Sequence, residues 1–428
     1  MPIRFRVNIL LFTLYFSCLY KGAGQFIRPL FTNGSVINLF IDLLIIFLGI
    51  VSIPTASKRT VRGLFVLLII STLTYLLNSG NKLDEHINGL RELLSIFMLL
   101  IIFSSLSKTG YLDDFTLRFR KFAMIFLVLQ IPMAVYQVKQ FGIGDRVGGT
   151  YGLYGGSGVL SLSIFLLIYF IIEYKGSDRP LMEKGKQLAL LAVFLTPIFL
   201  NETKVSFLLI PLMVLTFTSI KQLGSSIALL LLAGGFFYFF STQYSDQGEK
   251  VSNPITEIFS EDFLDSYLNG DVIIYEDVPR FTKIQIGVKH LSKDYRMLLF
   301  GQEYGAFKGG TTMKHSAFSD KYQWLLEGTI PYFFFLVISG GLSLIALLLF
   351  TLFGEMYAKL PEGQQKYSKG LMKFLTIVFF MMLFYNDAFR NQSFLIIFIY
   401  LIYFSRNHEP INEEEEEEEP QLEPVPQL

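Results

Sequence analysis

Long blocks of apolar residues, separated by short polar segments, recur along most of the chain. A helix of roughly 20 apolar residues crosses a hydrocarbon core of roughly 30 Å. Because lipid offers no hydrogen-bond partners, the backbone of such a block must pair within itself, which favours helices. The pattern predicts about twelve membrane-spanning helices, over Val7–Tyr20, Val36–Ile53, Gly63–Asn78, Leu90–Leu106, Phe122–Val138, Val159–Tyr174, Leu188–Leu200, Val205–Ser219, Ile227–Phe240, Ile330–Phe353, Leu371–Tyr385 and Phe394–Phe404.

One long polar segment interrupts these blocks, between the ninth and the tenth. We therefore expect an all-α integral membrane protein in which residues 1–240 hold the first nine spans and residues 330–404 hold the last three. Residues 241–329 between them form one large, partly helical loop. Residues 405–428 are rich in glutamate and proline, cannot build a core and are expected to form a solvated, disordered tail.

Lysine and arginine are distributed unevenly over the segments that join the spans. With the N-terminus inside, the cytoplasmic segments carry 19 of the 36 Lys and Arg residues, whereas the short outer loops carry 8. Short cytoplasmic loops are the ones enriched in positive charge. The asymmetry predicts that both termini are cytoplasmic and that the large loop, with the remaining 9, is extracytoplasmic.

Composition agrees with a membrane protein and excludes other classes. Hydrophobic residues make up 52% of the 428 residues and the mean hydropathy is +0.47, which is rare for a soluble domain. A formal net charge of zero provides no basic field for a nucleic-acid partner. The single cysteine, Cys18, rules out an internal disulfide and a Cys-based metal site, and its place in an apolar block is typical of a helix-packing residue.

Charge is segregated within the large loop. From Ser241 to Pro279 there are nine acidic residues and one basic residue, whereas residues 280–329 carry eight basic and four acidic residues. The second half of the loop is therefore the part expected to bind an anionic ligand.

The basic half has the pattern of two helices joined by a glycine-rich turn. The apolar stripe of the first helix, at helical spacing, consists of Phe281, Ile284, Val288 and Leu291. Arg280 stands at the start of this helix, where a guanidinium and the helix N-terminus can hold the same phosphate.

In the second helix, His315, Phe318 and Tyr322 are expected to share one face. A simpler alternative applies to both helices. They would only float on the lipid headgroups, with their cations anchored to lipid phosphate.

Four short motifs occur in order between residues 145 and 340. They are DRVGGTYGLYGGSGVLSLSIF, FLNETKVSFLLIPL, RFTKIQIGVKHL with FGQEYGAF, and HSAFSDKYQWLLEGTIPYFFFLV. Their order resembles the bacterial O-antigen polymerases and O-antigen ligases, which have an Arg-x-x-Gly-Thr segment, a Ser-Arg break between two spans, an arginine-led helix with a Gly-x-x-x-Gly-like turn, and a His before a Leu-x-Glu-Gly segment. The chain departs from this pattern at Lys204, where arginine is usual, and at Ser316, where asparagine is common after the histidine.

The resemblance implies a lipid-linked glycosyltransferase in a bacterial cytoplasmic (inner) membrane. Its reaction would transfer an oligosaccharide from undecaprenyl pyrophosphate to a sugar hydroxyl on the outer face, with inversion at the anomeric carbon and without a metal or other cofactor. Polymerisation of O-antigen or exopolysaccharide repeat units is the expected activity, and ligation to a lipid or protein acceptor is the alternative. A flippase and a chain-length regulator are the protein partners that such a role implies.

Cations are needed where negative charge develops on the departing pyrophosphate. We assign Arg280 and Lys204 to the pyrophosphate, and Arg146 to the donor phosphate or sugar. The alternatives are a turn residue or interfacial anchor for Arg146, and a snorkelling cation or an ion-pair partner of Glu202 for Lys204.

The acceptor hydroxyl must lose a proton, and an imidazole that titrates near neutrality can accept it. His315 is therefore the expected general base, and Arg280 and His315 are the expected catalytic residues. Residues expected to support these contacts are Glu202, Arg91, Arg390 and Tyr322. The other histidines receive no role: His290 on the outer face of its helix, and His86 and His408 in short loops or tails.

A transporter, such as a flippase for lipid-linked oligosaccharides, is the rival interpretation from another class. About twelve spans with both termini inside suit it as well. Transporters of this size are usually built from two comparable halves. The chain has its one large insertion between the ninth and tenth spans and no repeat of it.

Overall fold

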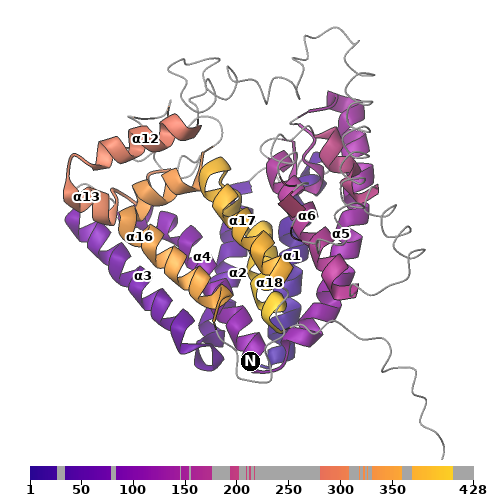
Figure 1. The fold of residues 1–428 in the computed structure, drawn as a ribbon, viewed down its shortest axis with the longest axis horizontal. Coiled ribbons are helices and arrows are strands. Elements are labelled where there is room, and N and C mark those ends of the chain that lie inside the picture. The colour runs from indigo at the N-terminus through magenta and orange to yellow at the C-terminus, as the bar shows by residue number, and fades with distance from the viewer. Residues whose placement is uncertain are drawn as a thin grey trace, which may run out of the picture.

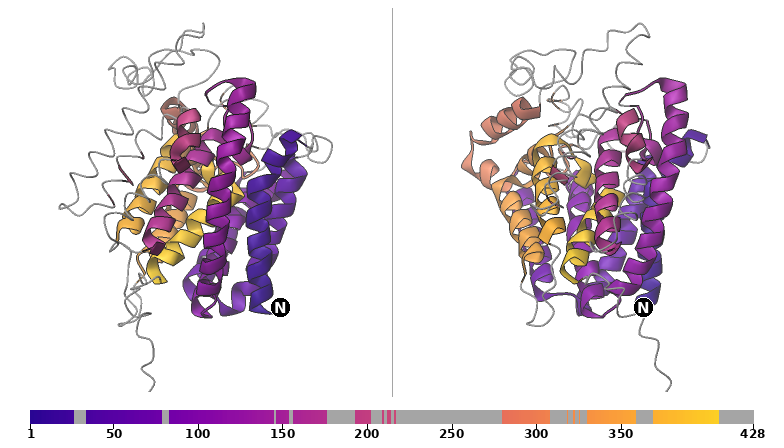
Figure 2. Two further views of the ribbon diagram at one scale, coloured as in Figure 1. Left: turned by 90° about the vertical axis from the view of Figure 1, so that its right-hand side faces the viewer. Right: turned by 45° about the vertical axis from the view of Figure 1, so that its right-hand side comes forward.

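A computed structural model of the chain describes residues 1–26, 34–78, 83–144, 146–153, 156–175, 193–201, 280–307, 330–358 and 369–407, with the single positions 209, 212, 213, 216, 318, 322 and 325. These residues form helices and no strands, so the expected all-α class is confirmed for them. The long helices are α1 (Ile3–Phe26), α2 (Gly34–Ser52), α3 (Lys58–Leu77), α4 (Leu83–Lys108), α5 (Leu112–Phe141), α6 (Gly156–Lys175), α16 (Tyr332–Met356), α17 (Lys369–Tyr385) and α18 (Gln392–Asn407). They form a bundle with the N-terminus at one end (Figures 1 and 2).

Seven of the described helices, α1 to α6 and α16, are long and apolar enough to cross a membrane. Helices α17 and α18, with 17 and 16 residues, are shorter than the roughly 20 residues of a full crossing. The seventh predicted block is helical over residues 193–200, and the eighth and ninth lie outside the described residues apart from single positions. The chain is thus a multi-pass membrane protein, and the number twelve stays a prediction.

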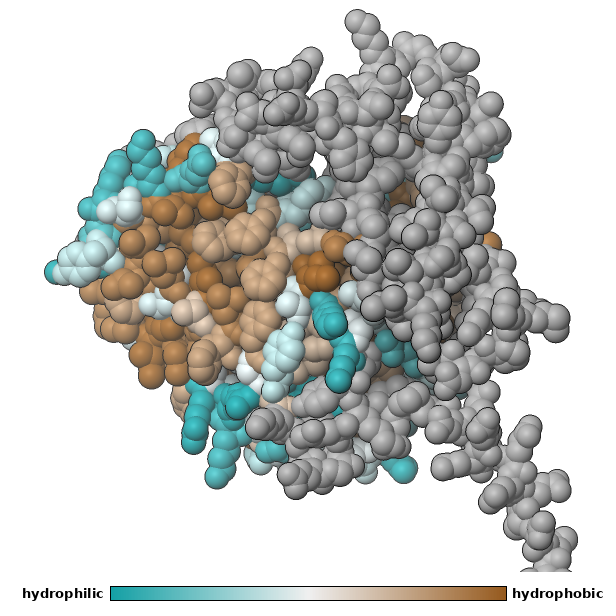
Figure 3. Space-filling view, in the orientation of Figure 1, coloured by the Kyte–Doolittle hydropathy of each residue, from teal (hydrophilic) through white to brown (hydrophobic). Residues whose placement is uncertain are grey.

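The surface of the bundle carries a broad apolar band. In Figure 3 the band covers the face of α16 and α17, and hydrophilic residues gather at its two ends. Its exposed side chains include Phe350 of α16, with 85% of its surface exposed, and Phe380 and Phe384 of α17. A contiguous apolar surface of this size is stable against lipid rather than water, so the band marks the depth of the bilayer.

Aromatic rings join the best-buried helices of the bundle. The ring centroid of Tyr400 in α18 lies 4.2 Å from that of Phe119 and 5.0 Å from that of Phe115, both in α5. The same ring lies 5.8 Å from Phe103 of α4 and 5.8 Å from Phe170 of α6. Tyr400 therefore connects α4, α5, α6 and α18 at the centre of the molecule.

The segment after α5 folds back into the bundle. It contains the short helix η3 (Gly149–Tyr151) and is buried over residues 147–152. Gln137 of α5 exchanges two hydrogen bonds with the backbone of Gly149, at 2.7 and 2.9 Å, and Gln130 exchanges two with Thr150, both at 2.9 Å. An irregular backbone is tolerated at membrane depth when protein groups satisfy its polar atoms, and these two buried glutamines do so.

Two helices of the predicted loop lie across the end of the bundle opposite the N-terminus, which we call the α12 end (Figure 1). They are α12 (Arg280–Leu291), which confirms the first predicted helix, and α13 (Tyr295–Phe300), which falls where a turn was predicted. The buried face of α12 is shifted from the predicted stripe and consists of Lys283, Ile284, Gly287 and Leu291. Phe281 is 42% exposed, because α12 contacts the bundle with the side that carries Gly287.

The turn after α13 is bonded directly to the bundle. Thr74 of α3 donates to the carbonyl of Phe300 at 2.6 Å, and the backbone N–H of Gln302 donates to the carbonyl of Ile338 at 2.8 Å. At Gly89 of α4 a Cβ atom would lie only 1.7 Å from the Tyr304 carbonyl oxygen, so glycine is required for the close approach. In the described residues the basic segment is therefore held by protein contacts, so α12 does not float free of the bundle, and anchoring of its cations to lipid phosphate stays an alternative.

Candidate functional site

Charged side chains of α2 and α4 and a glutamine at the start of α18 meet at the α12 end. Asp42 of α2 is fully buried, and its Oδ2 lies 2.8 Å from Nε of Arg91 in α4. Its other oxygen, Oδ1, accepts hydrogen bonds from Ser95 at 2.9 Å and from Gln392 at 3.0 Å. A buried carboxylate is stable only with such partners, so this arrangement ties α2, α4 and α18 together.

Arg390 belongs to the short helix η5 (Ala388–Arg390) between α17 and α18. Its Nε lies 3.0 Å from Glu92 of α4, its NH1 lies 3.3 Å from Asp387, and the guanidinium carbon is 4.9 Å from the ring centroid of Phe335. Burial alone would lower the pKa of Arg390, but the carboxylates of Glu92 and Asp387 together raise it above its ordinary value. This arginine therefore stays charged.

These residues form one network, because Arg91 and Glu92 are neighbours in α4. Its three carboxylates offset its two guanidiniums, so the network has no surplus positive charge for an anionic ligand. Arg91 and Arg390 lie where they can hold the architecture of the α12 end, and their predicted support of donor contacts stays a prediction. In the described part of the chain no group of three or more His, Cys, Asp or Glu side chains is arranged to hold a metal ion.

Replacing Asp42 by asparagine is expected to lower the free energy of unfolding by roughly 3–5 kcal/mol, because Arg91 keeps a buried charge without its counter-ion. The matched control is Asp114→Asn, which breaks the pair of Asp114 with Arg118, whose side chains are 33% and 39% exposed. An exposed pair contributes under about 1 kcal/mol. Thermal unfolding of both detergent-purified variants measures the difference. Equal melting temperatures for the two would mean that the Asp42 pair does not stabilise the bundle.

Arg280 is the first residue of α12, and its guanidinium carbon lies 4.2 Å above the ring centroid of Tyr385, the last residue of α17. A guanidinium stacks on an aromatic ring with its flat face and hydrogen-bonds with its edge. The contact with Tyr385 therefore restricts the position of the guanidinium, whose N–H groups are the donors that recognise a phosphate.

Basic residues accompany Arg280 along the same segment. Residues 280–307 carry five basic and two acidic residues, a net charge of +3. Lys283, one helical turn after Arg280, is fully buried in the face that α12 turns to the bundle. Lys283 received no role from the sequence and is not part of the predicted stripe of Phe281, Ile284, Val288 and Leu291. The structure brings it to the same end of α12 as Arg280, so it joins the candidate site.

His290 and Tyr322 contact each other beside the last turn of α12. His290 Nε2 lies 3.0 Å from the side-chain oxygen of Gln302, and Nδ1 lies 3.3 Å from the Tyr322 hydroxyl. Contacts at both ring nitrogens therefore hold the imidazole between Gln302 and Tyr322. The ring of Phe318 is 4.7 Å from that of Tyr322, so these two residues share a face as predicted. His290 is half-buried and bonded, not on an outer face, and the earlier placement is wrong.

Arg146 is exposed, at the start of the turn that the two glutamines hold. This position fits a turn residue or an interfacial anchor as well as it fits a donor-binding residue, so all three roles stay open for Arg146. His315, Lys204 and Glu202 lie outside the described residues. The helix over residues 193–200 gives way to a turn at Asn201, which is buried and donates to the Ser157 carbonyl at 3.2 Å.

His86 was expected in a short loop, and this was wrong. Helix α4 begins at Leu83, ahead of the apolar block, and His86 is buried with Nε2 2.8 Å from the hydroxyl of Ser71. The acidic members of the network, Asp42, Glu92 and Asp387, were also missed. For Asp42 a signal existed, because an ionisable residue inside a membrane span is rare and usually paired or functional.

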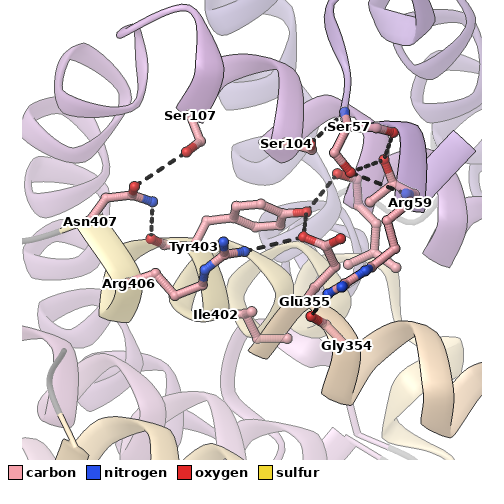
Figure 4. A network of polar contacts seen from close by, with 12 residues as sticks. Ser57, Arg59, Ser104, Ser107, Gly354, Glu355, Ile402, Tyr403, Arg406 and Asn407 are labelled. Carbon is pink, nitrogen blue, oxygen red and sulfur yellow. Dashed lines mark hydrogen bonds and ion pairs between the residues drawn. The ribbon is translucent and has the colours of Figure 1, made fainter. Parts of the chain in front are cut away.

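A second charged network lies at the end of the bundle that carries the N-terminus (Figure 4). Arg406 of α18 is 3.2 Å from Glu355 of α16, and both are buried. The Tyr403 hydroxyl lies 3.1 Å from the same carboxylate and 3.1 Å from the carbonyl of Leu100 in α4. These contacts fasten α4, α16 and α18 at the end away from α12, so ion pairs hold the bundle at both ends.

The fold and the site define a class: a multi-pass helical membrane protein with a basic segment bonded across one end of the bundle. Comparisons of the chain with models of protein families, with curated proteins and with solved structures found no match. The resemblance to O-antigen polymerases and ligases therefore stands on the sequence motifs alone.

Proposed function

We propose that this protein polymerises lipid-linked oligosaccharide repeat units on the membrane face that carries α12, using undecaprenyl pyrophosphate as the carrier. The observation that carries the proposal is the position of Arg280. It begins a helix bonded across the end of the bundle, next to the buried Lys283, in a segment with a net charge of +3. The substrate class comes from the motif resemblance. The position of Arg280 at the start of α12 is consistent with a pyrophosphate ligand.

The depth of α12 suits a lipid-linked donor. The segment lies at the hydrophilic edge of the apolar band, where the headgroups of a bilayer would be (Figures 1 and 3). A polyprenyl chain stays in the hydrocarbon, so its pyrophosphate lies at this depth and its glycan lies outside. Fixed cations in this layer meet the pyrophosphate without drawing the lipid out of the membrane.

The proposed reaction is a single inverting displacement. The acceptor hydroxyl oxygen bonds to the anomeric carbon while the bond from that carbon to the pyrophosphate oxygen breaks, and the leaving oxygen keeps the electron pair. The acceptor proton passes to His315. Arg280, with Lys204 and Arg146, is assigned to the negative charge on the leaving pyrophosphate. No step requires a metal ion.

The orientation proposed here places both termini in the cytoplasm. Reporter fusions after Tyr304 are expected to show an extracytoplasmic location, and fusions after His408 a cytoplasmic one, because of the 19 to 8 distribution of positive residues. An alkaline phosphatase reporter, active only outside, and a fluorescent protein, active only inside, give opposite signals at the two sites. A cytoplasmic signal after Tyr304 would place α12 on the wrong side for the reaction.

Deletion of the gene tests the function itself. Gel analysis of the surface polysaccharide, together with mass spectrometry of the carrier lipids, is expected to show single repeat units in place of long chains. Long chains stranded on the carrier would instead indicate a ligase. Single units confined to the inner leaflet would indicate a flippase. An unchanged polysaccharide and unchanged carrier lipids would overturn the glycan-transfer proposal.

A further inference from the structure

We propose that Tyr385 is a positioning residue for Arg280: its ring holds the guanidinium at the α12 end in the orientation that grips the donor pyrophosphate. The two residues come from opposite parts of the fold, the first residue of α12 and the last residue of α17. Their 4.2 Å separation is the shortest described distance between a cation and an aromatic ring. The identity of the ligand rests on the proposed function, whereas the positioning of Arg280 does not.

The Tyr385 side of this contact is fixed by the residues that follow it. The Asn386 carbonyl accepts from the Tyr332 N–H at 3.2 Å, and the Asn386 side chain accepts from the N–H of Ala388 at 3.0 Å. Asp387 is held by Arg390 at 3.3 Å. The ring of Tyr385 therefore projects from a helix end with little freedom to move.

The α12 side is fixed by packing at its middle rather than at its start. At Gly287 a Cβ atom would lie 2.6 Å from the ring of Phe334, so α12 and α16 are in close contact there. Ile284 is buried in the same face. Arg280 is the first residue of α12, so no earlier turn of this helix packs against its side chain. An arginine side chain loses about 2 kcal/mol of rotamer entropy when it is held in one conformation.

Stacking on Tyr385 removes much of that cost before a ligand arrives. Preorganised groups bind more tightly than mobile ones that make the same contacts. The ring face is the part that matters, because the attraction comes from its quadrupole and not from the phenol hydroxyl. Phenylalanine at position 385 should therefore replace tyrosine, and leucine should not.

The first experiment measures binding of undecaprenyl pyrophosphate to the full chain in lipid nanodiscs. Tyr385→Leu is expected to weaken binding by about 2- to 30-fold, the range that a cation–π contact supports, and Tyr385→Phe is expected to bind like the parent. The matched control is Phe384→Leu, which removes a neighbouring exposed ring whose described contact is a stack on Phe333. Equal binding by Tyr385→Leu and the parent, or equal weakening in Tyr385→Phe and Tyr385→Leu, would overturn the proposal.

A second measurement needs no ligand and separates the two proposals. The rate at which phenylglyoxal modifies Arg280, mapped by mass spectrometry, is expected to rise in Tyr385→Leu and to stay at the parent value in Tyr385→Phe and Phe384→Leu. An unchanged rate in Tyr385→Leu shows that the ring does not hold Arg280. If the parent fails to bind undecaprenyl pyrophosphate, the proposed function falls, and the modification rates still decide whether Tyr385 positions Arg280.

Discussion

Arg280→Ala is expected to lose glycan transfer while the protein still folds and inserts. The guanidinium at the start of α12 would stabilise charge that grows on the leaving pyrophosphate, and removing one such preorganised donor typically costs about 100- to 1,000-fold in rate. Arg280→Lys should recover little, because an ammonium offers a point charge where a guanidinium offers two parallel N–H groups. Turnover of lipid-linked donor by the purified variants measures both effects, with size-exclusion profiles as the test of folding.

The matched control for Arg280 is Arg296→Ala. Arg296 lies in α13 of the same basic segment, and its described contacts are with its neighbours Tyr295 and Asp294. Both variants lose one positive charge, so they differ only in position. Parent-like turnover in Arg280→Ala would return this arginine to the role of a lipid anchor. Equal losses in the two variants would mean that overall charge, not a specific contact, attracts the donor.

The sequence predicted the helices of the bundle because hydropathy is a local property. The first six apolar blocks and the last three each correspond to a described helix. The errors lie at the ends, as for α4, which extends from Leu83 through the polar stretch that holds Glu85 and His86. These polar residues are buried against other protein segments, such as the turn at Gly305, so hydropathy alone could not assign them to the helix.

The candidate site was predictable only in part, because its contacts join residues that are far apart in the chain. Arg280 was found from the charge pattern and the motif, whereas Tyr385 appeared only as the end of an apolar block. Asp42 stood out as an ionisable residue inside a predicted span, but no sequence pattern pairs it with Arg91. Lys283 lay outside the predicted apolar stripe of its helix, and only the packing of α12 on the bundle shows that it is buried.

His315→Ala is expected to lose at least about 100-fold in turnover, the usual scale for a general base. Donor binding should be almost unchanged, because the proposed phosphate contacts come from other residues. The parent should lose activity as the pH falls through the imidazole pKa, ordinarily about 6.5, because a protonated ring cannot accept the acceptor proton. The residual activity of His315→Ala should lack this acid limb. Turnover and donor binding across pH, in parent and variant, measure these effects.

Two controls make the assignment of His315 specific. His290→Gln removes the other histidine of the loop, whose ring is bonded to Gln302 and Tyr322, and should keep the parent rate and pH profile. A chelator should change nothing if the reaction needs no metal. An acid limb that disappears in His290→Gln and persists in His315→Ala would transfer the role of base to His290. A parent silenced by chelator would require a metal in the reaction, and the proposed displacement with its protein cations would have to be abandoned.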